Sequence, residues 1–130
     1  MQQLGDGILL SPTDLTKHVA CPHVTTLDLL ALTGAGPTPK APDDALNLVF
    51  AKGLEHEREY LDALRAEGRI IVAIPTRDAD GARVPPAEGE RLTLEAMRSG
   101  VDVIFQATLF DGEWMGYADF LLRVERPSEL

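Results

Sequence analysis

The stretch from Val101 to Val124, VDVIFQATLFDGEWMGYADFLLRV, decides the fold of this chain. Two apolar segments flank Asp111-Gly112, a dipeptide that favours the two-residue turn of a β-hairpin. The second segment, which begins at Trp114, is apolar except for Asp119 until Arg123 near its end. A carboxylate in the middle of a buried strand costs free energy unless a hydrogen-bond donor or a cation meets it. We therefore expect Asp119 to meet a divalent metal ion.

The pairing register of this hairpin follows from its turn. A two-residue turn at Asp111-Gly112 places Gln106 opposite Tyr117 and Ile104 opposite Asp119. Gln106, Tyr117 and Asp119 then share one face of the hairpin, and Gln106 lies diagonal to Asp119 within reach of a long side chain. The sequence thus predicts a polar face on one side of an otherwise packed hairpin.

The composition is that of one ordinary globular domain. The chain has 130 residues, of which 45% are hydrophobic and 25% charged, and a formal net charge of −9. This acidity argues against a self-sufficient nucleic-acid clamp, but an enzyme acting on nucleic acid needs acids to hold its cations. No run approaches the roughly 18 apolar residues that span a bilayer, and one cysteine, Cys21, cannot form an internal disulfide. We expect a cytoplasmic protein with no membrane segment.

Start and stop signals divide the rest of the chain. Ser11, Pro12 and Asp14 form a strong helix start, and this helix is expected to stop near Cys21. A second helix opens at Pro22 and closes at Gly34, before a loop rich in glycine and proline over 34–42. The other expected elements are a helix over 45–66, a strand over 69–74, a loop over 75–89, a helix over 90–99 and, after the hairpin, a stop at Pro127.

The longest helix carries a second misplaced acid. At 100° per residue, Glu57 falls inside the apolar stripe of this helix, and His56 lies at the edge of the stripe. The stripe is centred on Leu46, Phe50, Gly53 and Leu64.

Three segments together resemble the start of a RecB-type nuclease domain of the PD-(D/E)XK superfamily. They are LSPTDLTKHVACPHVTTLDL over 10–29, GLEHEREYLDALRAEG over 53–68 and LEAMRSGVDVIFQATLFDGEWMGYADFLLRVE over 94–125. The segments occur in family order and resemble RecB-like nucleases, with CRISPR-associated RecB-type exonucleases as more distant relatives. Each motif is short, and the order of the motifs makes the resemblance more specific.

This resemblance implies an α/β fold with a three-layer, restriction-endonuclease-like core and metal-dependent hydrolysis of DNA phosphodiesters. Residues 1–130 would form its N-terminal portion, in the order α-α-α-β-α-β-β. His56 and Asp119 correspond to ligands of Mg²⁺ or Mn²⁺, which are hard cations that prefer oxygen donors. Glu57 is assigned to the catalytic site as a supporting acid, and Gln106 and Tyr117 are candidate substrate or second-layer contacts.

The chain also departs from the family pattern. After the first hairpin acid the family carries an acid-x-lysine element, whereas here Asp119 is followed by FLLRVERPSEL, which contains no lysine. We therefore expect an N-terminal piece of a longer protein, whose open reading frame continues beyond Leu130 with such a strand. Its partners would be DNA and the remaining C-terminal part. Alone, the piece is expected to bind metal weakly and to cleave nothing.

Simpler interpretations stand beside each of these assignments. Asp119 can be a structural acid paired with Arg123 or with a helix N-terminus. His56 can be a hydrogen-bonded core histidine, and Glu57 a side chain that reaches solvent at the helix edge. Some RecB-type nucleases hold an iron–sulfur cluster with one upstream cysteine, a role open to Cys21, but a small buried thiol is the commoner outcome. The spacing of His18, Cys21 and His23 suggests zinc only weakly, since a fourth ligand is missing.

A second class of function remains open as well. The chain can be a non-catalytic module that keeps the front half of the nuclease fold and serves binding or assembly. In either case, without a further strand beside it, the segment from Trp114 to Val124 becomes a long apolar edge strand. We expect such an edge to aggregate or to pair with another copy of the chain.

Overall fold

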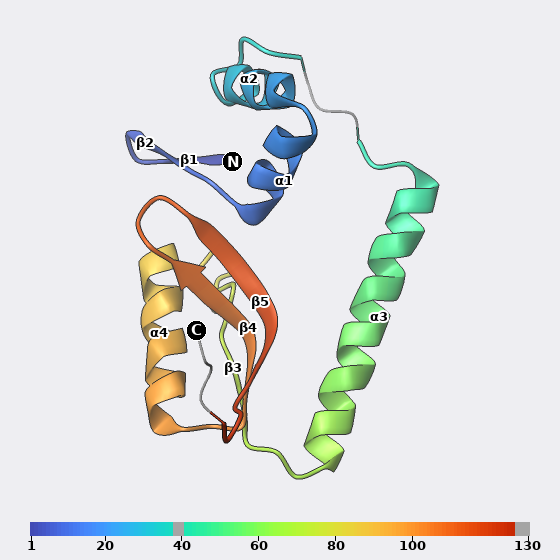
Figure 1. The fold of residues 1–130 in the computed structure, drawn as a ribbon, viewed down its shortest axis with the longest axis vertical. Helices are drawn as coiled ribbons and strands as arrows, with labels where there is room; N and C mark the ends of the chain where they lie inside the picture. Colours follow the sequence, from blue (N-terminus) through green and yellow to red (C-terminus); the bar gives the residue numbers. More distant parts are fainter. Residues whose placement is uncertain (38–40, 127–130) are drawn as a thin grey trace.

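The computed structural model describes residues 1–37 and 41–126, and Figure 1 shows their arrangement. The predicted loop over 34–42 is therefore described only in part, and Pro127, the predicted stop after the hairpin, lies outside the described residues. The elements are β1 Gln2–Leu4, β2 Gly7–Leu9, α1 Pro12–Ala20, α2 Pro22–Leu32, α3 Asp44–Ala66, β3 Ile71–Ala73, α4 Pro86–Ser99, β4 Val103–Phe110 and β5 Met115–Leu122.

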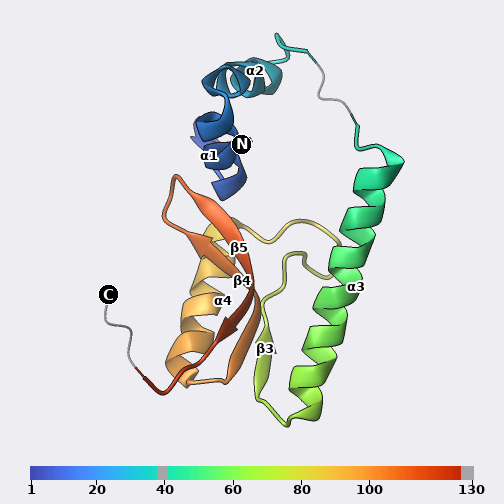
Figure 2. The ribbon, with the colours of Figure 1, turned by 45° about the vertical axis from the view of Figure 1, so that its right-hand side comes forward.

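A three-stranded sheet of order β3-β4-β5 organises the molecule. β3 and β4 are parallel and joined through α4, whereas β4 and β5 form the antiparallel hairpin. Figures 1 and 2 show α4 and α3 on opposite sides of this sheet. The mixed α/β class is thus confirmed. A core cluster at the α4 side of the sheet contains Ile74, Ala96, Ile104 and Ala107.

The hairpin forms where the sequence predicts it, but the predicted turn and register are wrong. The Asp111 carboxylate accepts hydrogen bonds from the backbone N–H groups of Glu113 and Trp114, at 3.0 and 2.6 Å. This side-chain cap holds a wider loop over 111–114, so that Phe110 pairs with Met115. These two hydrogen bonds, that from Trp114 first, also lower the pKa of the Asp111 carboxyl.

The wider loop shifts every cross-strand pair by two residues. Tyr117 pairs with Thr108 instead of Gln106, and Ile104 pairs with Leu121 instead of Asp119. A shift of two residues preserves the face on which each side chain lies, and its effect is that Gln106 lies across from Asp119, between the pairs Phe105–Phe120 and Ala107–Ala118, instead of diagonal to it. A side chain that caps its own loop is a local interaction that the Asp-Gly signal alone does not distinguish from a tight turn.

The predicted order also missed two features. The strands β1 and β2 pair antiparallel at the N-terminus, around Gly5, whose φ of 58° suits a tight turn. Three-residue strands are too short to show an alternation of apolar and polar residues. The turn-forming run Gly5-Asp6-Gly7 is therefore the main sequence signal for this hairpin. α4 begins at Pro86 and not at Glu90, because proline is favoured at the first helical position.

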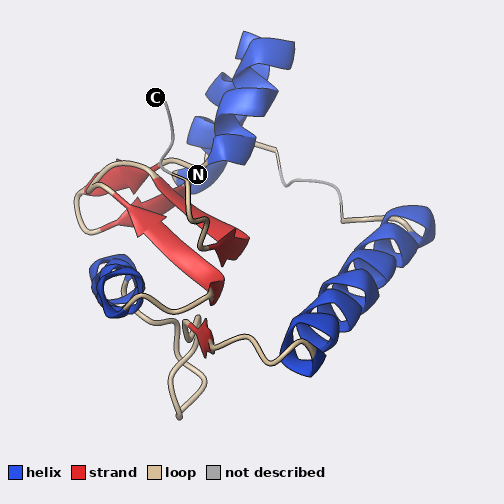
Figure 3. Cartoon of the chain, turned by 60° about the horizontal axis from the view of Figure 1, so that its bottom comes forward, coloured by secondary structure: helices blue, strands red, loops and turns tan. Residues whose placement is uncertain are grey.

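The apolar stripe of α3 is covered only near its C-terminal end. Leu61 and Leu64 are buried, whereas Val49, Phe50 and Leu54 expose 64%, 54% and 61% of their surface. Figure 3 shows α3 running away from the sheet toward its N-terminal end. The predicted apolar stripe therefore faces the core near the C-terminal end of α3, whereas much of the stripe has no covering element among the described residues.

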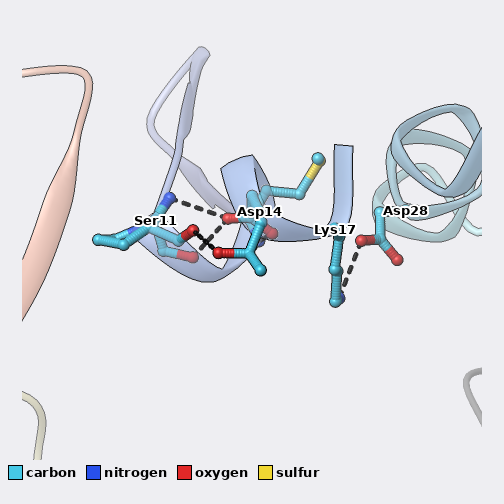
Figure 4. A network of polar contacts seen from close by, with 7 residues as sticks. Ser11, Asp14, Lys17 and Asp28 are labelled. Carbon is cyan, nitrogen blue, oxygen red and sulfur yellow. Dashed lines mark hydrogen bonds and ion pairs between the residues drawn. The ribbon is translucent and has the colours of Figure 1, made fainter. Parts of the chain in front are cut away.

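A polar network fixes the start of α1, as Figure 4 shows. The Asp14 carboxylate, only 6% exposed, accepts hydrogen bonds from the Met1 ammonium at 2.6 Å and from the Ser11 N–H and hydroxyl at 2.8 and 2.6 Å. Burial by itself would raise the pKa of Asp14, but these hydrogen bonds and the ammonium charge outweigh it and lower the pKa. The predicted helix start is confirmed, with Pro12 as its first residue.

A buried hydroxyl joins α4 to the sheet and is testable by substitution. Thr93 Oγ1 donates to the Gly89 carbonyl at 3.0 Å and accepts from the Thr108 N–H at 2.9 Å. Thr93→Val keeps the shape but leaves that N–H without its partner, so we expect a loss of about 1–3 kcal/mol in the free energy of unfolding. Urea denaturation measures it. Thr93→Ser keeps the hydroxyl and should lose less; a serine variant less stable than the valine variant contradicts this role.

The Asp14 network predicts an acid-dependent stability. Because the folded-state pKa of Asp14 lies below its ordinary value of 3.8, the carboxylate stabilises the fold above that pH and loses this effect as pH falls through the lowered pKa. Asp14→Asn should cost about 2–3 kcal/mol at neutral pH and flatten the decline below pH 3.8 in urea denaturation.

The matched control for this prediction is Asp28→Asn. Asp28 pairs with Lys17 at 3.0 Å, but the side chains of the two residues are more exposed than that of Asp14. Such an ion pair contributes only about 0–1 kcal/mol. If Asp28→Asn destabilised the chain as much as Asp14→Asn, the buried network at Asp14 would contribute no more stability than an exposed ion pair, contrary to this prediction.

Candidate polar site between the long helix and the hairpin

Three polar side chains from three elements meet between α3 and the hairpin. Gln106 Nε2, on β4, donates to Glu57 Oε1 on α3 at 2.5 Å and to Asp119 Oδ1 on β5 at 3.3 Å. The two carboxylates thus converge on one amide group. Glu57 is half-buried and Asp119 is exposed. The side chains singled out as misplaced acids in the sequence are brought together, although 62 positions of chain separate residues 57 and 119.

The backbone of β4 is irregular at this point. Gln106 has a φ of 56°, and it is the one non-glycine residue with positive φ in the described part of the chain. The ladder pairs Phe105 with Phe120 and Ala107 with Ala118, and it omits Gln106 and Asp119 between them. A left-handed conformation costs a residue with a Cβ about 1–3 kcal/mol, and strain of this kind is often found at functional sites. Here it accompanies the contact of the Gln106 amide with both acids.

His56 lies beside this polar cluster, in the same cavity. The cavity has a volume of about 680 Å³ and is lined by His56, Glu57 and Asp119 together with apolar side chains of α3 and β5. Tyr60 packs edge-on against Phe120, with ring centroids 4.8 Å apart. These two aromatic rings line the cavity, and neither residue is among the predicted site residues. A signal for both was present in the sequence, since Tyr60 lies three residues after Glu57 and Phe120 directly follows Asp119.

Two other predicted site residues lie elsewhere. Tyr117 lines a different cavity, together with Met1 and Ser11 near the N-terminus. Arg123, the alternative partner of Asp119, donates to the Gly100 carbonyl at 2.8 Å. Among residues 1–37 and 41–126, no ion pair involves Asp119. The structural interpretation of Asp119 as a partner of Arg123 therefore has no contact to support it.

Cys21 lies far from this cluster along the chain and links two helices. It ends α1 and precedes the first residue of α2, and its side chain is exposed, not buried as expected. The nearby His18 Nδ1 is within 2.8 Å of Thr25 Oγ1. The described residues contain no group of three His, Cys, Asp or Glu side chains that could hold a metal ion. This finding covers the zinc spacing near Cys21 as well as the cluster around Asp119.

The side chains at the polar cluster are of types that bind divalent cations, but too few of those that the structure describes come together to form a complete set of ligands. Two carboxylates and a neighbouring imidazole are ligand types that Mg²⁺ or Mn²⁺ accepts. The Gln106 amide, however, holds both carboxylates, and the described residues do not complete a set of three ligands. A metal site at this position needs further donors from outside these residues.

Comparisons with protein-family models, curated proteins and solved structures found no match to this chain. The resemblance to RecB-type nucleases therefore stays a prediction from sequence. None of the helices in the described residues is long and apolar enough to cross a membrane.

The Gln106 bridge predicts a measurable coupling between α3 and the hairpin. Gln106→Leu removes the donor that Glu57 and Asp119 share, so that two carboxylates face each other without a bridging group. We expect amide hydrogen exchange of α3 near Glu57 to speed up by about threefold to tenfold, the equivalent of one net hydrogen bond. The measurement is hydrogen exchange followed by NMR.

The matched control is Gln3→Leu. Gln3 is another glutamine on a short strand, and its amide donates to the Gly5 carbonyl, far along the chain from α3. That variant should leave exchange in α3 unchanged. Equal exchange rates in α3 for the wild type and Gln106→Leu would show that the bridge does not couple the two elements.

Proposed function

We propose that this chain is the front part of a RecB-type, metal-dependent DNA nuclease. The observation that carries the proposal is the meeting of Glu57 and Asp119 on the Gln106 amide, with His56 lining the same cavity. A histidine from a helix and an aspartate from a hairpin, His56 and Asp119 here, are the metal ligands that the resemblance implies for such a nuclease. The mixed α/β fold, with helices on both sides of the sheet, is compatible with it.

The chain's own residues would divide the work at this site. Asp119 and His56 would hold the Mg²⁺ or Mn²⁺ ion, and Glu57 would support them by holding a water or a ligand. A bound ion of this kind lowers the pKa of water and stabilises charge on a phosphate. The Gln106 amide would keep the two carboxylates together before the ion binds, because its N–H groups offset part of their repulsion.

The proposal requires an acid-x-lysine element in addition to these residues. The sequence after Asp119, FLLRVERPSEL, contains no lysine and so does not supply this element. The free side of β5 is where such a strand would pair, since β5 ends the sheet order β3-β4-β5. Near its start this side is covered at one point, where Met115 N–H donates to the Leu10 carbonyl at 2.8 Å. The remaining length of β5 is an edge strand, as the sequence predicts.

The test is DNA cleavage by the protein that includes an acid-x-lysine strand. Asp119→Ala and His56→Ala should each abolish Mn²⁺-dependent cleavage while circular dichroism stays unchanged. Glu57→Gln, as a supporting group, should weaken Mn²⁺ binding by about 10–100-fold. The present chain alone is expected to bind Mn²⁺ weakly and to cleave nothing.

Asp62→Ala provides the matched control, because Asp62 lies on α3 and its carboxylate pairs with Arg65 on the surface. This variant should cleave DNA like the wild type. Full activity of Asp119→Ala would end the nuclease proposal.

A second candidate function is a non-catalytic binding or assembly module. The specific observation in its favour is the exposure of Val49, Phe50 and Leu54 on one helix face. Contiguous apolar surface of this kind commonly marks an interaction site. Both functions use the same side of the molecule, and only the nuclease requires a cation for its chemistry.

A further inference from the structure

The exposed face of α3 carries a glycine that nothing in the described chain explains. Gly53 lies in the middle of a 23-residue helix, where glycine is less favourable than any residue except proline. Its φ is not positive, and a Cβ built on it would meet no atom within 4 Å. Neither backbone conformation nor internal packing therefore calls for glycine. A close approach by a group from outside would give it a purpose.

Apolar side chains surround Gly53 on the same face. Phe50 and Leu54 are more than half exposed, and both line the cavity that extends to Phe120 on β5. At 100° per residue, Gly53 lies between Val49 and Phe50 around the helix, and both of these side chains are exposed and line the same cavity. The missing side chain of Gly53 leaves a notch into which another helix can pack closely, because interaxial distance depends on the side chains at the crossing point. The notch has the form of a helix-in-groove site.

Two carboxylates at one end of this notch favour a partner with a basic side chain. Glu57 and Asp119 line the cavity, and no ion pair involves either carboxylate within the part of the chain that the structure describes. Their common partner is the neutral Gln106 amide. An occupant that brings a lysine or arginine to this end gains attraction that a neutral or acidic occupant lacks.

We propose that the face of α3 around Gly53 is a docking surface for a basic amphipathic helix of a partner protein. Apolar side chains of that helix pack on Phe50 and Leu54, a small residue crosses at Gly53, and a basic side chain meets Glu57 and Asp119. A second copy of this chain fits less well, because it carries a net charge of −9 and brings its own Glu57 to the contact. The surface goes beyond the proposed nuclease and does not depend on it.

The test uses a designed peptide as the probe. Its leucines recur at helical spacing, an alanine lies at its midpoint, and lysines fill the polar face; a matched peptide carries glutamate in place of lysine. We expect the labelled lysine peptide to bind in fluorescence anisotropy, more weakly at higher salt, and the glutamate peptide to bind at least about tenfold less tightly. Equal binding of both peptides, or no binding of the lysine peptide up to about 1 mM, overturns the proposal.

Variants of α3 separate docking from folding. Gly53→Leu fills the notch and favours the helix, so it should weaken peptide binding by about tenfold or more while the thermal midpoint stays equal or rises. Ala51→Leu, on the opposite helical face, should leave binding unchanged. Undiminished binding by Gly53→Leu overturns the proposal.

Two further measurements separate the alternatives. One shows whether a second copy of the chain occupies the surface, and the other shows whether the two carboxylates attract the peptide. Sedimentation velocity that shows a dimer disrupted by Gly53→Leu would assign the face to a second copy and overturn the partner helix. Glu57→Gln with Asp119→Asn should remove most of the salt dependence of lysine-peptide binding. These measurements contain no metal and no DNA. If Asp119→Ala still cleaves DNA, the nuclease proposal fails, but the lysine peptide should bind all the same.

Discussion

The Gln106 amide is the polar contact on which the arrangement of α3 and the hairpin depends. It donates to Glu57 on the helix and to Asp119 on β5, and so one side chain from β4 connects three elements. The cost is visible in the backbone, because Gln106 adopts a φ of 56° and interrupts the strand ladder. Hydrogen bonds to charged acceptors contribute about 1.5–3 kcal/mol each, which is of the same size as this strain. The distortion can therefore persist without a further ligand, while it keeps two acids close together.

Much of the site could be predicted from the sequence because the signal was chemical. Asp119 and Glu57 each break an apolar pattern, and the structure brings them to one place. The exact contact could not be predicted, because it depends on the hairpin register, and the Asp111 side chain changes that register by capping a wider loop. Tyr117 shows the consequence: a two-residue shift places it opposite Thr108 instead of Gln106.

For the fold as well, local features could be predicted from the sequence, whereas features that depend on long-range contacts could not. Ser11, Pro12 and Asp14 predict the start of α1, since helix capping is written in adjacent residues. The ammonium group of Met1 reaches Asp14 only because β1 and β2 fold back on each other, and this pairing of short strands has little sequence signature. Periodicity likewise identifies the apolar face of α3, but it cannot say which part of that face another element covers.

The two proposals for this side of the molecule make different demands on the same residues. A divalent cation and a basic side chain would both satisfy Glu57 and Asp119, so the acids alone do not distinguish them. Gly53 does, because a cation bound to carboxylates has no need of a glycine on the exposed face of α3. A mid-helix glycine costs about 1 kcal/mol relative to alanine. The exposed Phe50 and Leu54, on the same part of the helix, add unfavourable contact with water. A helix that packs at this point would bury Phe50 and Leu54 and would use the space left by Gly53, so it would offset both unfavourable terms. Metal binding at Asp119 would offset neither.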